Sequence, residues 1–322
     1  MNGSLKRFFK IALPVGLGLF LIWLSYIQFT PEQLREIGDH FSRARYGYVI
    51  LAVVLSVISH IIRATRWNIL LEPMGYRPGL ANNFMAVSIA YLMNIFIPKS
   101  GEVSRAVVLD RYEGVPFEKG FGTIITERII DLLFLAIFTL VALFWQFDEL
   151  FDYLKGIIPI KKLLVALLLL LALGVILLLF VRYSQSRLGK RVRNFVLGLK
   201  EGVFSILRMK RTALFVIQTI LIWLLYLLSF YTATLALEET AGIAFGTLLI
   251  TFVVGSFSFA FTNSGFGSYP LFVAGILSIF GVASTVGTAF GWIVWSSNIV
   301  MLIFFGVISL VLLPVVNKTD KA

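Results

Sequence analysis

The sequence predicts an all-α polytopic membrane protein with about eight transmembrane segments, including two re-entrant hairpins. Three observations predict this class. Hydrophobic residues make up 59% of the chain, and charged residues only 14%, against about a quarter in soluble domains. The mean hydropathy is +0.92. Several uncharged stretches also reach the ~20 apolar residues that a helix needs to cross the hydrocarbon core of a bilayer.

The uncharged stretches give the membrane segments in chain order. They are 11–29, 46–62, 81–98, 132–147, 163–181, 212–237 and the long run from Thr240 to Asn317. The last run is long enough for three crossings, or for one crossing and a hairpin. The basic start of the chain resembles a signal peptide, but its apolar run is too long and lacks a small-residue cleavage site. We therefore expect an anchored first helix.

Basic residues in the connections predict the orientation of the chain, because cytoplasmic loops are rich in Lys and Arg. The segment 182–211 holds nine basic residues and one acidic residue, whereas 30–45 holds three of each. We therefore expect 182–211 inside, 30–45 outside and both termini in the cytoplasm, with the protein in the cell (inner, cytoplasmic) membrane. Apolar residues in 182–211 recur at helical spacing, which predicts an amphipathic helix on the inner leaflet. A plain topology signal is the alternative.

Two segments must begin and end on the same side of the membrane to satisfy this orientation. One contains the break "IPKSGE" at 97–102, and the other contains "TNSGFGSYP" at 262–270. Pro ends a helix and Gly permits unusual backbone, so each break predicts a re-entrant hairpin. The two breaks share Ser-Gly, which is consistent with an inverted repeat that meets at the midplane. Chance similarity between apolar sequences is the alternative.

Polar residues at these breaks and at neighbouring helix ends are the candidate substrate-binding residues. A charge at the bilayer centre costs about 2.5–3.5 kcal/mol on insertion scales, so it needs a partner or a wet cavity. The candidates are Arg63, Arg66, Asn94, Pro98, Gly101, Glu102, Arg105, Glu127, Arg128, Asp131, Asn263, Gly265, Gly267 and Asn298. The arginines suit a lipid phosphate, and the carboxylates would hold the arginines or titrate. Asn298 is expected to complement the second break. Membrane-interface anchors and simple helix bends are the structural alternatives.

Several function classes lack support in the sequence. There is no cysteine, and the two histidines, His40 and His60, cannot build a zinc site alone. Nucleophile-elbow, Walker, zinc-protease and dinucleotide-binding motifs are missing, so we expect no enzyme activity, no cofactor and no metal. The net charge is +11, and many of the basic residues lie beside apolar segments. This distribution indicates a membrane surface and no nucleic-acid partner.

The order of several motifs resembles the lysylphosphatidylglycerol synthase transmembrane-region family, also called the flippase-like domain family. These motifs are Arg66-Trp67, Tyr91-x-x-Asn94, Pro98-x-x-Gly101-Glu102-x-x-Arg105, Glu127-Arg128-x-x-Asp131 and a Gly-x-Gly turn near 265. The resemblance covers nearly all of 1–322 as a single transmembrane domain, and it implies a polytopic bundle that moves or binds lipids. Some members add a C-terminal soluble aminoacyltransferase domain that attaches lysine to phosphatidylglycerol. We expect this chain to lack that domain and its synthase activity.

The second-half motif departs from the family pattern, which reads Pro-Gly-Gly-x-Gly followed by an acid. Here Asn263 lies at or next to the usual Pro, and Tyr269 or Pro270 lies near the acid. The expected function is a lipid flippase or translocase that binds a phospholipid or polyprenyl-phosphate-linked headgroup in an intramembrane polar cavity. A lipid-modifying membrane enzyme and a non-transporting membrane partner of a soluble synthase are the alternatives. Homo-oligomerisation is left open.

The predicted orientation is tested by cysteine labelling, which the cysteine-free sequence makes clean. We expect Arg111→Cys to react with a membrane-impermeant maleimide only from the cytoplasm, and Glu238→Cys only from outside. Labelling of Arg111→Cys from outside would contradict the first re-entrant hairpin.

Overall fold

A computed structural model describes residues 3–157 and 210–317, with four isolated positions between them; within the two ranges it describes the side chains of 15–152 and 210–317. Within these ranges every regular element is a helix, which confirms the all-α class. The contacts divide the chain into two compact units. The first unit runs to Ile125 and resumes at Ala213, and the second lies between Thr126 and Thr212.

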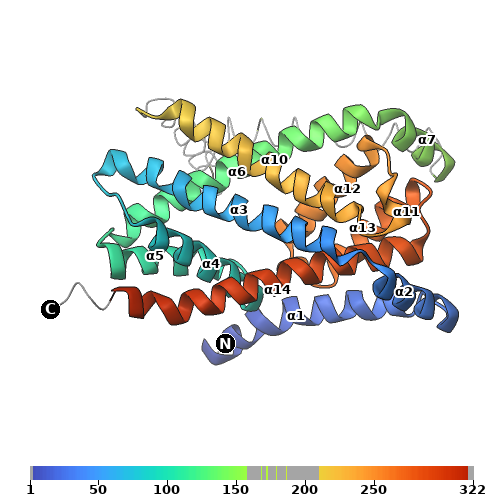
Figure 1. The fold of residues 1–322 in the computed structure, drawn as a ribbon, viewed down its shortest axis with the longest axis horizontal. Helices are drawn as coiled ribbons and strands as arrows, with labels where there is room; N and C mark the ends of the chain where they lie inside the picture. The colour runs from blue at the N-terminus through green and yellow to red at the C-terminus, as the bar shows by residue number, and fades with distance from the viewer. Residues whose placement is uncertain are drawn as a thin grey trace. The chain divides into compact units, whose positions relative to one another are not determined.

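The first unit contains most of the described helices (Figure 1). They are α1 (Gly3–Tyr26), α2 (Pro31–Arg43), α3 (Tyr46–Leu71), a 3-10 turn (Glu72–Met74), α4 (Leu80–Phe96), α5 (Ser100–Glu113), α10 (Thr212–Thr234), α11 (Glu238–Ala241), α12 (Phe245–Phe261), α13 (Ser268–Ile279) and α14 (Ser284–Val316). The helix α6 (Phe117–Trp145) begins in the first unit and continues in the second, which also holds α7 (Phe147–Ile157).

Four described helices are long and apolar enough to cross a membrane. They cover Tyr46–Met74, Phe117–Trp145, Thr212–Thr234 and Ser284–Val316. Four shorter apolar helices accompany them, at Val15–Tyr26, Leu80–Phe96, Phe245–Phe261 and Ser268–Ile279. The chain is therefore a multi-pass membrane protein. The predicted segment 163–181 and the basic amphipathic loop at 182–211 lie outside the described residues, apart from a few single positions.

The connection at 30–45, for which the sequence analysis predicts no element, forms the helix α2. Its start is a capping box. The Thr30 hydroxyl accepts from the backbone N–H of Gln33, and the side-chain oxygen of Gln33 accepts from the backbone N–H of Thr30. Proline at the first helical position fits this start, because its missing N–H would have no helical partner there. The helix buries His40 and exposes most of its other side chains.

The first predicted hairpin is formed by α4 and α5, with its break at residues 97–99. The two open ends of this hairpin meet. The Glu113 carboxylate at the end of α5 accepts from the backbone N–H of Gly79 at 3.1 Å, and also from the amide of Asn82 at the start of α4. Asn82 and Asn317 donate to each other at 2.9 Å. The hairpin therefore opens beside the C-terminal end of α14.

The second predicted hairpin is formed by α12 and α13, with its break at residues 262–267. It packs against the N-terminal half of α14 through small residues. A β-carbon added at Gly287 or Gly291 would press on Ala274 or Pro270 of α13. In the C-terminal half of α14, Gly306 gives the same close approach to Leu92 of α4.

The two hairpins thus occupy opposite halves of α14 and open toward opposite ends of it. In Figure 1, α4 and α5 lie toward the C-terminal end of α14, and α12 and α13 lie toward its N-terminal end. This opposed arrangement is the one that an inverted repeat predicts.

The close contact of α13 with α14 predicts unequal effects of two glycine substitutions. Gly291→Ala should lower the stability by about 1–3 kcal/mol, because the backbone of Pro270 lies where the new methyl group would go. Gly275→Ala is the matched control, since Gly275 lies in α13 with open space around it. Helix propensity should make that change neutral or stabilising by up to about 1 kcal/mol. Thermal unfolding of purified protein in detergent measures both, and equal melting temperatures would contradict the packing.

Candidate functional site

The tips of the two opposed hairpins touch each other. The side-chain amide of Asn263 in the second break donates to the carbonyl oxygen of Ile95 at 2.7 Å. In the opposite direction, the ammonium of Lys99 donates to the carbonyl oxygen of Ala260 at 2.8 Å. These contacts join two breaks that lie about 165 residues apart in the sequence and that the sequence analysis identifies separately.

The first break owes its shape to one glycine and one asparagine. Lys99 has a φ of 61°, which turns the chain from α4 into α5. The side-chain oxygen of Asn94 then accepts from the backbone N–H of Gly101 at 2.8 Å. A β-carbon at Gly101 would overlap the carbonyl oxygen of Ala90, so only glycine allows α5 to approach α4 this closely. Pro98 lies in the break itself, and Glu102 lies in the first turn of α5.

The second break contains three residues with left-handed backbone within four positions. Ser264, Gly265 and Gly267 all have positive φ, at 52°, 75° and 71°. The N–H of Gly265 donates to the Thr262 hydroxyl at 3.2 Å, so it already has a partner inside the break. A β-carbon at Gly267 would overlap the carbonyl oxygen of Gly18 in α1. The broken backbone that the sequence predicts is therefore present, and it is closely packed.

The helix α14 contacts the second break through a tryptophan. The indole N–H of Trp295 donates to the carbonyl oxygen of Ser264 at 2.9 Å. Asn298, which the sequence predicts to complement this break, lies on the same helix, and its side-chain amide donates to the carbonyl oxygen of Val294 at 2.9 Å. A tryptophan in a long apolar helix gives no local signal of such a role.

Two of the candidate arginines lie on α3 and are buried against α10. The Arg66 side chain is fully buried and donates to the Thr219 hydroxyl at 2.8 Å. Its guanidinium also lies 5.2 Å from the centre of the Phe215 ring. Arg63 is 3% exposed and donates to the Tyr226 hydroxyl at 3.3 Å. The contacts with α10 thus include hydroxyl groups and an aromatic face.

The third buried arginine extends from α5 to the same part of α3. The Arg105 guanidinium lies 3.6 Å from the centre of the Trp67 ring, and Arg105 is 2% exposed. The indole N–H of Trp67 donates to the Thr123 hydroxyl at 2.8 Å. Trp67 is therefore fixed by α6 through its indole N–H, and its ring contacts the guanidinium of Arg105. The Arg66-Trp67 motif in the sequence is a usable signal for the role of Trp67. Thr123, which binds the Trp67 indole, gives no such signal.

The remaining acidic candidates belong to the second unit. Glu127 is fully buried. The Arg128 guanidinium lies 3.5 Å from the Asp131 carboxylate, at the (i, i+3) spacing of neighbours on one helix face. Among the described residues, no group of three or more His, Asp or Glu side chains is arranged to hold a metal ion.

Comparisons with known proteins place these residues in a wider group. A family model described as the lysylphosphatidylglycerol synthase TM region matches residues 11–306. A UPF0104 membrane protein of Methanothermobacter thermautotrophicus is 26% identical over 269 residues, which is 77% of each chain. One from Methanocaldococcus jannaschii is 31% identical over 114 residues, about a third (34%) of each chain.

A further similarity is to the glycosyltransferase AglD of Haloferax volcanii, which is 32% identical over 132 residues. This match covers 39% of the present chain and 20% of AglD. No solved structure matches the chain.

The contact between the hairpin tips predicts a stability difference between two asparagines. Asn263→Ala should lower the stability by about 1–3 kcal/mol, because the partly buried carbonyl of Ile95 loses its amide donor. Asn298→Ala is the matched control, since that amide contributes only a bond to its own helix. Thermal unfolding in detergent measures both. If Asn298→Ala proves the more destabilising change, the tip contact does not hold the hairpins together.

Proposed function

The chain belongs to the lysylphosphatidylglycerol synthase transmembrane-region family, and from this premise we propose that it is a lipid translocase. Its ligand would be the phosphate-bearing headgroup of a phospholipid. The family description favours a phospholipid, and the similarity to a glycosyltransferase supports a polyprenyl-phosphate-linked headgroup as the second substrate class.

The observation that carries this proposal is the contact between the tips of the two opposed hairpins. Broken helices whose ends meet inside the membrane are typical of transporters that expose one site alternately to the two sides. Here the break at 97–99 and the break at 262–267 exchange hydrogen bonds through Lys99 and Asn263. If the two tips separated, a headgroup could pass between them from one side of the membrane to the other.

The buried arginines support a phosphate as the recognised group. A guanidinium can donate two parallel hydrogen bonds to phosphate oxygens, which an ammonium cannot. Arg105 lies over the ring of Trp67, and Arg66 donates to Thr219, so both are fixed in position before a ligand arrives. Ionisable residues inside a membrane domain often mark a substrate pathway, because their burial is otherwise unfavourable. The acyl chains of the lipid would stay in the surrounding bilayer.

The proposed location is the cell membrane, with both termini in the cytoplasm. The excess of basic residues in 182–211 and at the two ends of the chain supports this orientation. The mouth of the first hairpin, at Glu113 and Asn317, would then face the cytoplasm, and the mouth of the second would face outside.

A flipping assay tests the proposal. Purified protein is reconstituted into vesicles that contain phosphatidylglycerol with a fluorescent acyl chain, and an impermeant reductant bleaches the outer leaflet. We expect bleaching beyond half of the signal with the wild-type protein. Arg105→Lys should reduce the rate by at least about tenfold, because the planar fork and its stacking on Trp67 are lost. Gly275→Ala is the folded control.

Two outcomes would contradict the proposal. Bleaching that stops at half of the signal with folded wild-type protein, for both phosphatidylglycerol and a polyprenyl phosphate, would exclude translocation of these lipids. Conversion of the lipid to a new product in the same vesicles would instead support a lipid-modifying enzyme. An unchanged rate for Arg105→Lys would remove the planar guanidinium of Arg105 from the headgroup site.

A further inference from the structure

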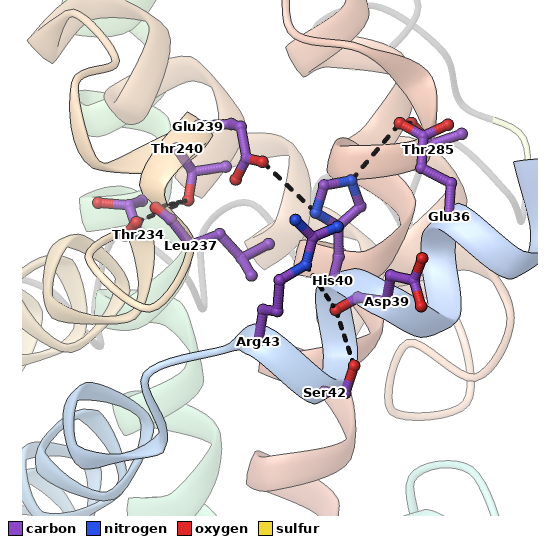
Figure 2. A network of polar contacts seen from close by, with 10 residues as sticks. All are labelled: Glu36, Asp39, His40, Ser42, Arg43, Thr234, Leu237, Glu239, Thr240 and Thr285. Carbon is purple, nitrogen blue, oxygen red and sulfur yellow. Dashed lines mark hydrogen bonds and ion pairs between the residues drawn. The ribbon is translucent and has the colours of Figure 1, made fainter.

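A histidine is buried between two carboxylates at the mouth of the second hairpin (Figure 2). The His40 side chain is 7% exposed, and it lies on the buried face of α2. Its Nε2 atom lies 3.6 Å from the carboxylate of Glu36, one turn earlier on the same helix. Its Nδ1 atom lies 3.5 Å from the carboxylate of Glu239 on α11. Each ring nitrogen therefore faces its own carboxylate.

This arrangement matches the protonated form of the ring. A neutral imidazole has one N–H, so it can donate to one carboxylate while its other nitrogen turns a lone pair toward the second. An imidazolium has an N–H on each nitrogen and a positive charge, so it attracts both carboxylates. The carboxylate side chains are 49% and 46% exposed, which gives a proton from water a short path to the buried ring.

The same cluster contacts the chain on both sides of the second hairpin. Glu239 lies on α11, which leads directly into α12. The Glu36 carboxylate also accepts from the hydroxyl of Thr285 at 3.0 Å, and Thr285 lies in the first turn of α14, the helix that follows α13. The hairpin is thus held at its entry and at its exit by two carboxylates that flank one histidine.

The short helix α11, which holds Glu239, is fixed to its neighbours by hydrogen bonds. The hydroxyl of Thr240 donates to the carbonyl oxygen of Thr234 at 2.6 Å, which ties α11 to the end of α10. The backbone N–H of Arg45, just after α2, donates to the carbonyl oxygen of Ala236 at 2.8 Å. Since α11 is fixed to α10, a change in the charge of His40 acts on the separation between α2 and α11.

We propose that Glu36, His40 and Glu239 form a proton-binding site, and that the bound proton fastens α2 to the mouth of the second hairpin. The other charged residues on or beside α2 and α11 are Glu32, Arg35, Asp39, Arg43, Arg45 and Glu238. Asp39 uses its backbone carbonyl to accept from Ser42 and Arg43. The helix α14 adds no charge, since none occurs from Thr240 to Asn317. Loss of the proton removes the positive charge and one of the two N–H donors, so that one carboxylate faces a lone pair, and this end of the hairpin loosens. The site does not depend on the proposed translocase activity.

Thermal unfolding of the full-length protein in detergent tests the proposal through a double-mutant cycle at about pH 5.5 and pH 8.5, on either side of ordinary histidine titration. At the lower pH, His40→Gln and Glu239→Gln should each lower the melting temperature by at least about 2 °C. The double variant should lower it by less than the sum of the two. At the higher pH, the shift caused by His40→Gln should fall to less than half. His60→Gln is the matched control, and its shift should be independent of pH.

A His40→Gln shift of equal size at both pH values would overturn the proposal and leave His40 a packing residue. A second measurement covers a variant that does not fold. Spin labels at the exposed positions Ser42→Cys and Glu238→Cys report the separation of α2 and α11. We expect a narrow distance distribution at about pH 5.5 and a broad one at about pH 8.5. Adding Glu239→Gln should abolish this difference. A distance distribution that does not change with pH in the labelled protein without Glu239→Gln would also overturn the proposal.

Discussion

The exchange of hydrogen bonds between two broken helices is the interaction on which the rest of the first unit depends. A helix that stops inside an apolar medium leaves carbonyl groups without donors, and lipid cannot supply them. Here each break supplies a side-chain donor to the helix end of the other, Lys99 to Ala260 and Asn263 to Ile95. The pairing fixes where each hairpin stops, and it therefore fixes which residues of α14 each hairpin can reach.

The glycines of α14 follow from this constraint. Once the tips are joined, α4 and α13 must both lie close to one helix, on its two halves. Gly306 admits Leu92 of α4, and Gly291 admits Pro270 of α13. Because α14 has no charged residue, dispersion contacts and close packing must hold this arrangement, as is usual between helices in membranes.

Local signals in the sequence predict much of the architecture. The breaks at Pro98–Gly101 and around Gly265 follow from residues that end helices or tolerate positive φ, and the opposed hairpins follow from charge counting. The meeting of the tips is not predictable in this way, because Ile95 and Ala260 contribute only backbone carbonyls and therefore carry no sequence signal. The start of α2 does have a local signal, because Thr30-Pro31 followed by Gln33 is typical of a helix start. The prediction of a plain connection at 30–45 does not use this signal. Trp67 was visible beside Arg66, but its support by Thr123 depends on a fold that no local pattern encodes.

The paired amides of Asn82 and Asn317 give the end of α14 a mechanical role. Asn317 caps that helix and is bonded in both directions to Asn82, which in turn contacts Glu113 across the mouth of the first hairpin. A force applied at the end of α14 is therefore transmitted to the mouth of the first hairpin, where the start of α4 meets the end of α5. A tail, a domain or a bound protein attached at that end would act on the first hairpin through this contact, without touching it.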